Sequence, residues 1–227
     1  MDLFQHPPIL DHDWFEPVLR ESWLYRPYSA SAMAGMMAGT ELLDNWVEQR
    51  QGYVAGYRLG KDVDDFWGFE TRIGGAFVRL DDTPLAQAAQ QAADDAAGLS
   101  PDDPYRRRFD AGREADLFQW DVDLLYYPCG DAPLRPYGMF GLGLMHVSFI
   151  DRLSQPFSEI MYTMPLAIGL KRRCTEYAAI RLEIADTLAF GDRLDTFHEF
   201  SLTAGIELRF GGTRKAYWPW NPGRHYW

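Results

Sequence analysis

The chain has 227 residues, a net charge of −11 at pH 7 and only two cysteines. The length suits one large domain or two small ones, and the negative charge argues against a nucleic-acid partner, because phosphate binding needs a basic surface. No apolar run reaches the roughly 18 residues of a transmembrane helix, so that class is excluded. Two cysteines are too few for a disulfide scaffold.

The first 27 residues are expected to be an irregular extension, because proline removes a backbone donor and interrupts regular structure. Its prolines are Pro7, Pro8, Pro17 and Pro27. The start, Met1-Asp2-Leu3-Phe4, lacks the basic segment and apolar core of a signal peptide. If the protein is exported, we expect this sequence to be a form from which the signal is absent.

Beyond residue 27, eight stretches alternate between apolar and polar residues with a period of two. Strands place successive side chains on opposite faces, so this period predicts strands. The expected strands are Ser29–Glu41, Gly52–Gly60, Phe66–Leu80, Leu117–Tyr127, Tyr137–Phe149, Ile160–Lys171, Ala178–Phe190 and Phe197–Phe210. Pro165 falls inside one of them and predicts a bulge or an unpaired position there, because proline cannot donate to the ladder.

The last of these strands shows the pattern most clearly. One face is continuously apolar after its first residue: His198, Phe200, Leu202, Ala204, Ile206, Leu208 and Phe210. The other face is small, polar or charged: Glu199, Ser201, Thr203, Gly205, Glu207 and Arg209. This combination is typical of a strand with lipid outside and a polar interior behind it. The sequence therefore predicts an all-β, eight-stranded, antiparallel up-and-down transmembrane β-barrel over residues 28–212.

The connections alternate in length, as in outer-membrane barrels with short periplasmic turns and longer outer loops. The short ones are 60–65, 129–136 and 172–177, and the others are 42–51, 81–116, 151–159 and 191–196. The long outer loop, 82–116, is expected to carry a short helix from Pro84 to Ala97, with Thr83 as its cap. Its Arg106-Arg107-Arg108 run is interpreted as a solvated loop tip, with contact to lipopolysaccharide phosphates as the alternative. The aromatic content of 15% fits the girdles of a membrane barrel.

Three segments resemble the OmpA-like outer-membrane β-barrel family. They are 205–212, 137–143 and the turn and strand 169–184, and the resemblance covers residues 29–212. It implies a bacterial outer-membrane location and an embedded barrel that contacts outer-membrane lipid or lipopolysaccharide. The chain departs from the family archetype because only a short tail, 213–227, follows the barrel. We therefore expect no C-terminal peptidoglycan-binding domain.

The inward face of the predicted strands carries charges of both signs. They are Arg58, Glu70, Arg72, Asp121, Asp123, Lys171, Arg181, Glu183, Glu199, Glu207 and Arg209. An eight-stranded barrel is just wide enough to be filled by its own side chains, and buried charges need partners. We expect an internal salt-bridge network that closes the barrel; the alternative is a narrow or gated pore lined by charge.

A possible catalytic group lies on the lipid side near the outer end of one strand. His146 and Ser148 resemble the His-x-Ser pair of the outer-membrane lipid A deacylases, with Glu159 as a possible third member. The chemistry would use histidine as base and serine as nucleophile. The competing interpretation is a set of interfacial polar residues, and we expect no enzyme activity.

Cys129 and Cys174 fall in two different periplasmic turns and could form one disulfide in an oxidising periplasm. The tail is rich in the aromatic residues that anchor protein interfaces, which indicates a possible docking surface for a partner; the alternative is a flexible tail tucked against the barrel rim. These residues are Tyr217, Trp218, Trp220, Tyr226 and Trp227. No metal-ligand spacing is found, and no metal or other cofactor is expected.

The sequence thus favours a structural or anchoring outer-membrane protein whose termini bind a periplasmic or membrane partner. One alternative is an outer-membrane lipid-modifying hydrolase. The others are a narrow gated pore and a soluble, lipocalin-like lipid carrier. In the carrier the facing would be inverted, with apolar residues inside and charges outside.

Overall fold

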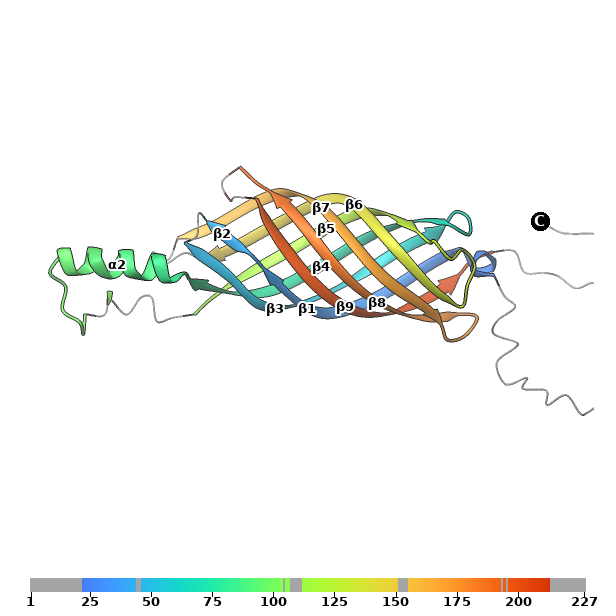
Figure 1. Cartoon of the computed structure of the whole chain (residues 1–227), viewed down its shortest axis with the longest axis horizontal. Coiled ribbons are helices and arrows are strands. Elements are labelled where there is room, and N and C mark those ends of the chain that lie inside the picture. The colour runs from blue at the N-terminus through green and yellow to red at the C-terminus, as the bar shows by residue number, and fades with distance from the viewer. Residues whose placement is uncertain are drawn as a thin grey trace, which may run out of the picture.

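The computed structural model describes residues 22–43, 46–103, 105–106, 112–150, 155–192, 194 and 196–212. It is a closed antiparallel β-barrel with one helix projecting beyond one end (Figure 1). Its elements are η1 (Trp23–Tyr25), β1 (Tyr28–Gly39), β2 (Glu41–Leu43), β3 (Val47–Asp62), β4 (Trp67–Asp82), α2 (Pro84–Ala96), β5 (Arg113–Tyr126), β6 (Leu134–Ile150), β7 (Pro156–Arg173), β8 (Ala178–Phe190) and β9 (Phe197–Phe210).

The nine strands make an eight-stranded barrel, because β1 and β2 both pair with β3 and are separated only by Thr40. From β3 to β9 each strand pairs with the next one in sequence, and β1 pairs with β9 as well as with β3. Tyr28, for example, lies opposite both Phe210 and Lys61. The predicted eight-stranded up-and-down fold is confirmed.

The predicted strand limits differ most from the structure at the start of β3. The sequence places the start of this strand at Gly52, whereas it begins at Val47. A register shift between Gln49 and Gly52 interrupts the period of two, and a bulge of this kind hides the pattern on which the prediction depends. The limits of β8 and β9 are as predicted.

Pro165 occupies a position without a partner on its β6 side. It pairs with Thr187 of β8, but the β6–β7 ladder passes from Phe140 opposite Leu166 to the pair formed by Gly143 and Thr163. The β6–β7 pairs on the two sides of this gap keep the same register. The gap therefore accommodates a residue without a backbone N–H, and the predicted unpaired position is confirmed.

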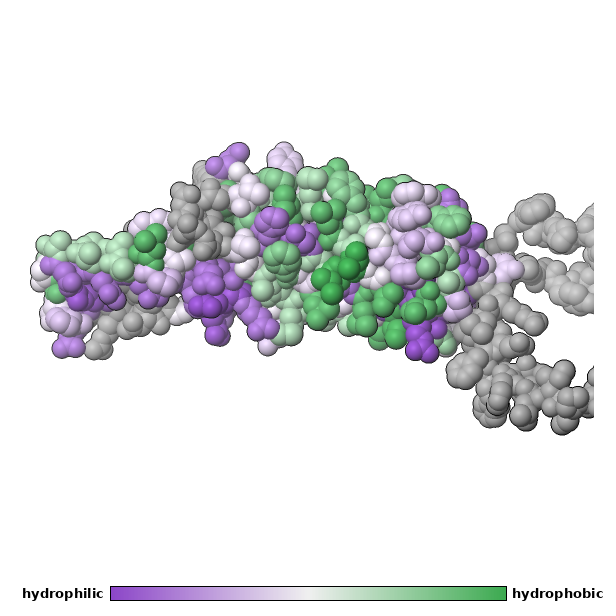
Figure 2. All heavy atoms as spheres, viewed as in Figure 1, coloured by the Kyte–Doolittle hydropathy of each residue, from purple (hydrophilic) through white to green (hydrophobic). Residues whose placement is uncertain are grey.

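The outside of the barrel is apolar. Figure 2 shows hydrophobic residues gathered over the middle of the barrel and hydrophilic residues near its ends. Ile168, Leu182 and Ile206, from three strands, are 68%, 55% and 62% exposed. Because the apolar side chains face outward and the charged ones inward, the inverted, lipocalin-like alternative is wrong. Within the described ranges, no helix is long and apolar enough to cross a membrane.

The two ends of the barrel differ. Figure 1 places α2 beyond the end at which β4 finishes, and η1 at the opposite end, beside the start of β1 and the finish of β9. Thr83 caps α2 by accepting a hydrogen bond from the backbone N–H of Ala86. We call the α2 end the outer end and the η1 end the inner end. Arg106 of the outer loop pairs with Asp95, while Arg107 and Arg108 lie outside the described residues.

Candidate functional site: the barrel lumen

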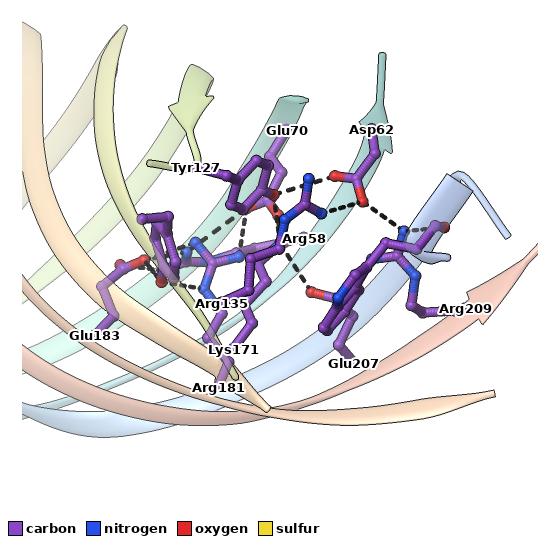
Figure 3. Close-up of polar contacts among 12 residues, drawn as sticks. Arg58, Asp62, Glu70, Tyr127, Arg135, Lys171, Arg181, Glu183, Glu207 and Arg209 are labelled. Carbon is purple, nitrogen blue, oxygen red and sulfur yellow. Dashed lines mark hydrogen bonds and ion pairs between the residues drawn. The ribbon is translucent and has the colours of Figure 1, made fainter. Parts of the chain in front are cut away.

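The eleven charged side chains expected to face inward are all buried inside the barrel. They are Arg58, Glu70, Arg72, Asp121, Asp123, Lys171, Arg181, Glu183, Glu199, Glu207 and Arg209. Two further buried charges at the inner end, Asp62 and Arg135, were missed because the sequence places them in turns rather than at strand ends. Most of these groups form one connected network in the inner half of the lumen (Figure 3).

Glu183 on β8 is a centre of this network. The Arg58 guanidinium on β3 donates to both of its carboxylate oxygens, at 2.7 and 2.5 Å. Arg181 and the Tyr137 hydroxyl donate to the same carboxylate, each at 2.7 Å. A buried carboxylate with this many charge-assisted bonds compensates much of the free energy lost when it leaves water.

A second centre joins β4, β7 and β8. Glu70 accepts bonds from Lys171 at 2.7 Å and from Arg181 at 2.5 Å. Lys171 also lies 3.0 Å from Glu207 on β9 and donates to the Tyr127 hydroxyl at 3.1 Å. Cations and anions therefore alternate across the lumen, and together they bridge strands on opposite sides of the barrel.

Asp62 connects the network to the inner mouth. Its carboxylate accepts bonds from Arg135 at 2.8 Å, from Arg209 at 2.6 Å and from the Tyr127 hydroxyl at 3.1 Å. Tyr127 directly follows β5, and its hydroxyl accepts from Lys171 while it donates to Asp62.

Trp23 of η1 covers the inner mouth and is only 1% exposed. Its indole N–H donates to the Ala132 carbonyl at 2.8 Å, and its backbone N–H donates to Asp131 at 2.8 Å. The Arg209 guanidinium lies 4.7 Å from the ring centre and donates to the Trp23 carbonyl. The segment before β1 is therefore part of the closure of the barrel.

Near mid-barrel the sheet makes room for two aspartates by using glycine opposite them. Asp121 lies opposite Gly143 and accepts bonds from Arg72 at 2.8 Å and from Thr163 at 3.0 Å. Asp123 lies opposite Gly141, and a Cβ at that glycine would overlap the carboxylate. In the part of the chain that the structure describes, neither carboxylate oxygen of Asp123 has a hydrogen-bond partner.

The outer half of the lumen is apolar, which the sequence prediction missed. Its buried side chains come from all around the barrel: Met37, Val47, Ala76, Val78, Leu80, Ala115, Leu117, Met145, Val147, Phe149, Met161, Ala189, Leu194 and Phe197. A signal for them was present, because the strand ends next to the outer loops are apolar on their inward face. The expected charge-filled lumen is corrected to one whose outer half is mainly apolar and whose charges there are Glu199 and the ion pair of Asp82 with Arg113.

A small cavity of about 20 Å³ separates the two halves. Arg72 and Glu199 line it together with Met33 and Met145. This volume is roughly that needed for a single water molecule. Gln49 donates to Glu199 at 3.4 Å.

On the outside of the barrel, the expected group of His146, Ser148 and Glu159 does not assemble. Glu159 lies opposite Val147, on the inward side of its strand, and accepts bonds from the backbone N–H groups of Asp192 and Leu194. It therefore holds the loop between β8 and β9, and its proposed role beside His146 is wrong. The imidazole of His146 contacts Ser158 instead, at 2.8 Å.

The possible disulfide is absent, since Cys129 and Cys174 are both free and exposed. They lie in separate turns, and the Cys174 thiol contacts the Arg172 carbonyl at 3.8 Å. The five aromatic residues of the expected docking surface, Tyr217 to Trp227, lie outside the described residues.

Comparison with family models and with curated proteins gives no match. Among solved structures, the chain is similar to Neisserial surface protein A, with 12% identity, a TM-score of 0.53 and coverage of 81% of this chain and 97% of that one. It is also similar to the outer membrane protein OprG from Pseudomonas aeruginosa, with 14% identity, a TM-score of 0.51 and coverage of 85% and 100%. The resemblance to OmpA-like barrels is therefore confirmed as a likeness of fold.

Proposed function

We propose that this protein is an outer-membrane barrel with a closed lumen that serves as a structural or anchoring protein rather than as a channel. The observation that carries the proposal is the filling of the lumen over its whole length, by ion pairs in the inner half and by apolar side chains in the outer half. The apolar exterior and the likeness to solved outer-membrane barrels support the location.

Both halves oppose ion flow, for different reasons. In the inner half, an ion would have to displace charges that already pair with one another, as Arg58 pairs with Glu183. In the outer half, it would have to enter an apolar segment, where dewetting closes a pore. Together these features favour a closed barrel over a narrow or gated pore.

A partner is proposed to bind at the inner side through the terminal segments 1–27 and 213–227. The first residue of β1 and the last residue of β9 lie opposite each other, so both segments leave the barrel at the same end. Tryptophan and tyrosine, which are frequent in the tail, are enriched at the centres of interfaces. A periplasmic or membrane protein would meet both segments together.

Single-channel recording tests the closed lumen. The purified protein should shift in mobility on gels between unboiled and boiled samples, which shows a folded barrel, and should leave the conductance of a planar bilayer unchanged. Discrete conductance steps that depend on the folded protein would overturn the closed-lumen proposal.

Site-specific photo-crosslinking in cells tests the partner. A crosslinker at Trp220 should give one adduct of defined mass, while the same crosslinker at Leu85, on the exposed side of α2, serves as the control for the outer end. The absence of an adduct from Trp220, or the same adduct from both sites, would contradict binding through the tail.

A further inference from the structure

A row of polar side chains crosses the outward face of β5, β6 and β7 near their outer ends. Asp116 lies opposite Ser148, and Ser148 lies opposite Ser158, so the three residues are direct cross-strand neighbours. The next row toward the inner end consists of Phe118, His146 and Ile160. His146 is thus a polar side chain between two exposed apolar ones.

These two rows lie in the outer part of the apolar band. On the inner side of His146, the outward residues of β6 are Phe140, Leu142 and Leu144, all exposed to the surroundings of the barrel. In a membrane, the boundary between hydrocarbon and headgroups is where the ester carbonyls of lipids lie. A reactive side chain at this level meets acyl esters rather than dissolved substrates.

Ser158 and His146 have the arrangement of a nucleophile and its base. The Ser158 hydroxyl oxygen lies 2.8 Å from Nε2 of His146, on adjacent strands and in a diagonal position. In the tautomer with the ring proton on Nδ1, Nε2 accepts the hydrogen bond from the hydroxyl. Since both side chains are outside the lumen and Ser158 is exposed, this contact plays no part in the network that closes the barrel.

We propose that Ser158 and His146 form a hydrolytic site for acyl esters of membrane lipids in the outer leaflet. The proposal rests on the outer-membrane orientation proposed above but not on the closed lumen. It differs from the expectation made from the sequence, because the serine bonded to His146 is Ser158 rather than Ser148, and Glu159 takes no part.

The reaction has two steps, acylation of Ser158 and hydrolysis of the acyl-serine. Ser158 Oγ forms a bond to the ester carbonyl carbon while its proton passes to His146 Nε2. The C–O bond to the lipid alcohol then breaks, and the leaving oxygen takes that proton. Water, activated by His146, next attacks the acyl-serine, so that a fatty acid is released and the Ser158 hydroxyl is restored.

A long-chain fluorophosphonate and lipid hydrolysis together test the site. The purified, folded barrel is reconstituted into vesicles of phosphatidylethanolamine and phosphatidylglycerol, with or without lipopolysaccharide, and released fatty acids are measured. The two vesicle types distinguish a phospholipid from a lipopolysaccharide as the source of the ester. We expect the fluorophosphonate to modify the peptide that contains Ser158.

Three variants identify the residues. Ser158→Ala should abolish both labelling and fatty-acid release, and His146→Ala should lower both by about 100-fold or more, because a positioned base contributes roughly that factor. Ser148→Ala is the matched control, because Ser148 lies directly opposite Ser158 on the same outward face but is not bonded to His146. The activity of this variant should stay within about twofold of the wild type. Heat-modifiability on gels confirms that each variant is folded.

Two results would overturn the proposal. One is a folded wild-type protein that neither reacts with the fluorophosphonate nor releases fatty acid from either vesicle. The other is activity that survives Ser158→Ala but is lost in Ser148→Ala, which would assign the nucleophile to the other serine. Neither result bears on conductance, so the closed-lumen proposal would stand or fall separately.

Discussion

The inner and outer halves of the lumen are built on the same strands yet are filled in opposite ways. In the inner half, Glu183 is surrounded by two guanidinium groups and a phenol, whereas in the outer half Leu80 and Met161 are fully buried among apolar neighbours. The first half depends on pairing, because a single lost partner leaves a charge uncompensated. The second depends on shape, because a lost methyl group leaves only a cavity.

The largest effect is expected from Glu183→Ala. The change leaves Arg58 and Arg181 buried without their shared carboxylate, and breaking a buried pair from one side costs about 3–5 kcal/mol. The loss should appear in urea unfolding of the reconstituted barrel. Glu176→Ala is the control, because its ion pair with Arg26 is partly exposed to solvent and surface pairs contribute roughly 1 kcal/mol or less.

Glu183→Ala also separates the two halves functionally. The apolar outer half is untouched by this change, so the barrel should remain closed and bilayer conductance should stay at the wild-type level. A conducting but folded variant would mean that the inner network alone closes the lumen.

Leu80→Ala should have a slightly smaller effect. This side chain is 0% exposed in the apolar half, and removal of a buried leucine costs about 2–5 kcal/mol, depending on how far the neighbours can collapse. Leu80→Met keeps the volume and should cost less than about 1.5 kcal/mol. If the two variants unfolded at the same urea concentration, the packing account of the outer half would be wrong.

Gly141→Ala tests the fit between the aspartates and the glycines opposite them. The added Cβ would overlap the Asp123 carboxylate and would lie 2.9 Å from the Pro165 ring. Overpacking of this kind costs about 1–3 kcal/mol. Gly138→Ala, on the same strand with nothing within 4 Å of the added carbon, should be close to neutral in the same unfolding assay.

Trp23→Phe should have the smallest effect. The substitution keeps an aromatic ring at the inner mouth but removes the N–H that donates to the Ala132 carbonyl. A hydrogen bond of this type contributes about 1 kcal/mol. Urea unfolding should show a loss of that size with an unchanged slope, and a loss several times larger would indicate that the indole has a role beyond this bond.

The strand pattern was sufficient to predict the eight-stranded fold and the inward position of the charges, since both follow from a period of two. The pairing of those charges could not be predicted, because Arg58 and Glu183 are 125 residues apart and meet only across the lumen. The apolar outer half was missed for a different reason. A signal was available in the apolar inward residues next to the outer loops, such as Leu80 and Val147, but the charges farther along the same inward face set the expectation for the whole lumen.

The proposed Ser158–His146 site also could not be predicted from the sequence pattern alone. Alternation correctly put His146 on the lipid side, but sequence proximity suggested Ser148 as its partner. The residue that contacts it is Ser158 on the next strand, and which serine lies within reach depends on the cross-strand register rather than on spacing along the chain.

Closure by the pairing of β1 with β9 has a consequence for assembly. Arg58 belongs to the second strand around the barrel and Glu183 to the seventh, so their bond can form only when the sheet has curled far enough to bring these distant strands face to face. An open, partly inserted sheet would lack this bond, and Arg58 and Glu183 would keep only the partners on their own or neighbouring strands, Glu70 and Arg181. Ion pairing across the lumen thus stabilises the closed barrel relative to sheets in which one or two strands have not yet been added.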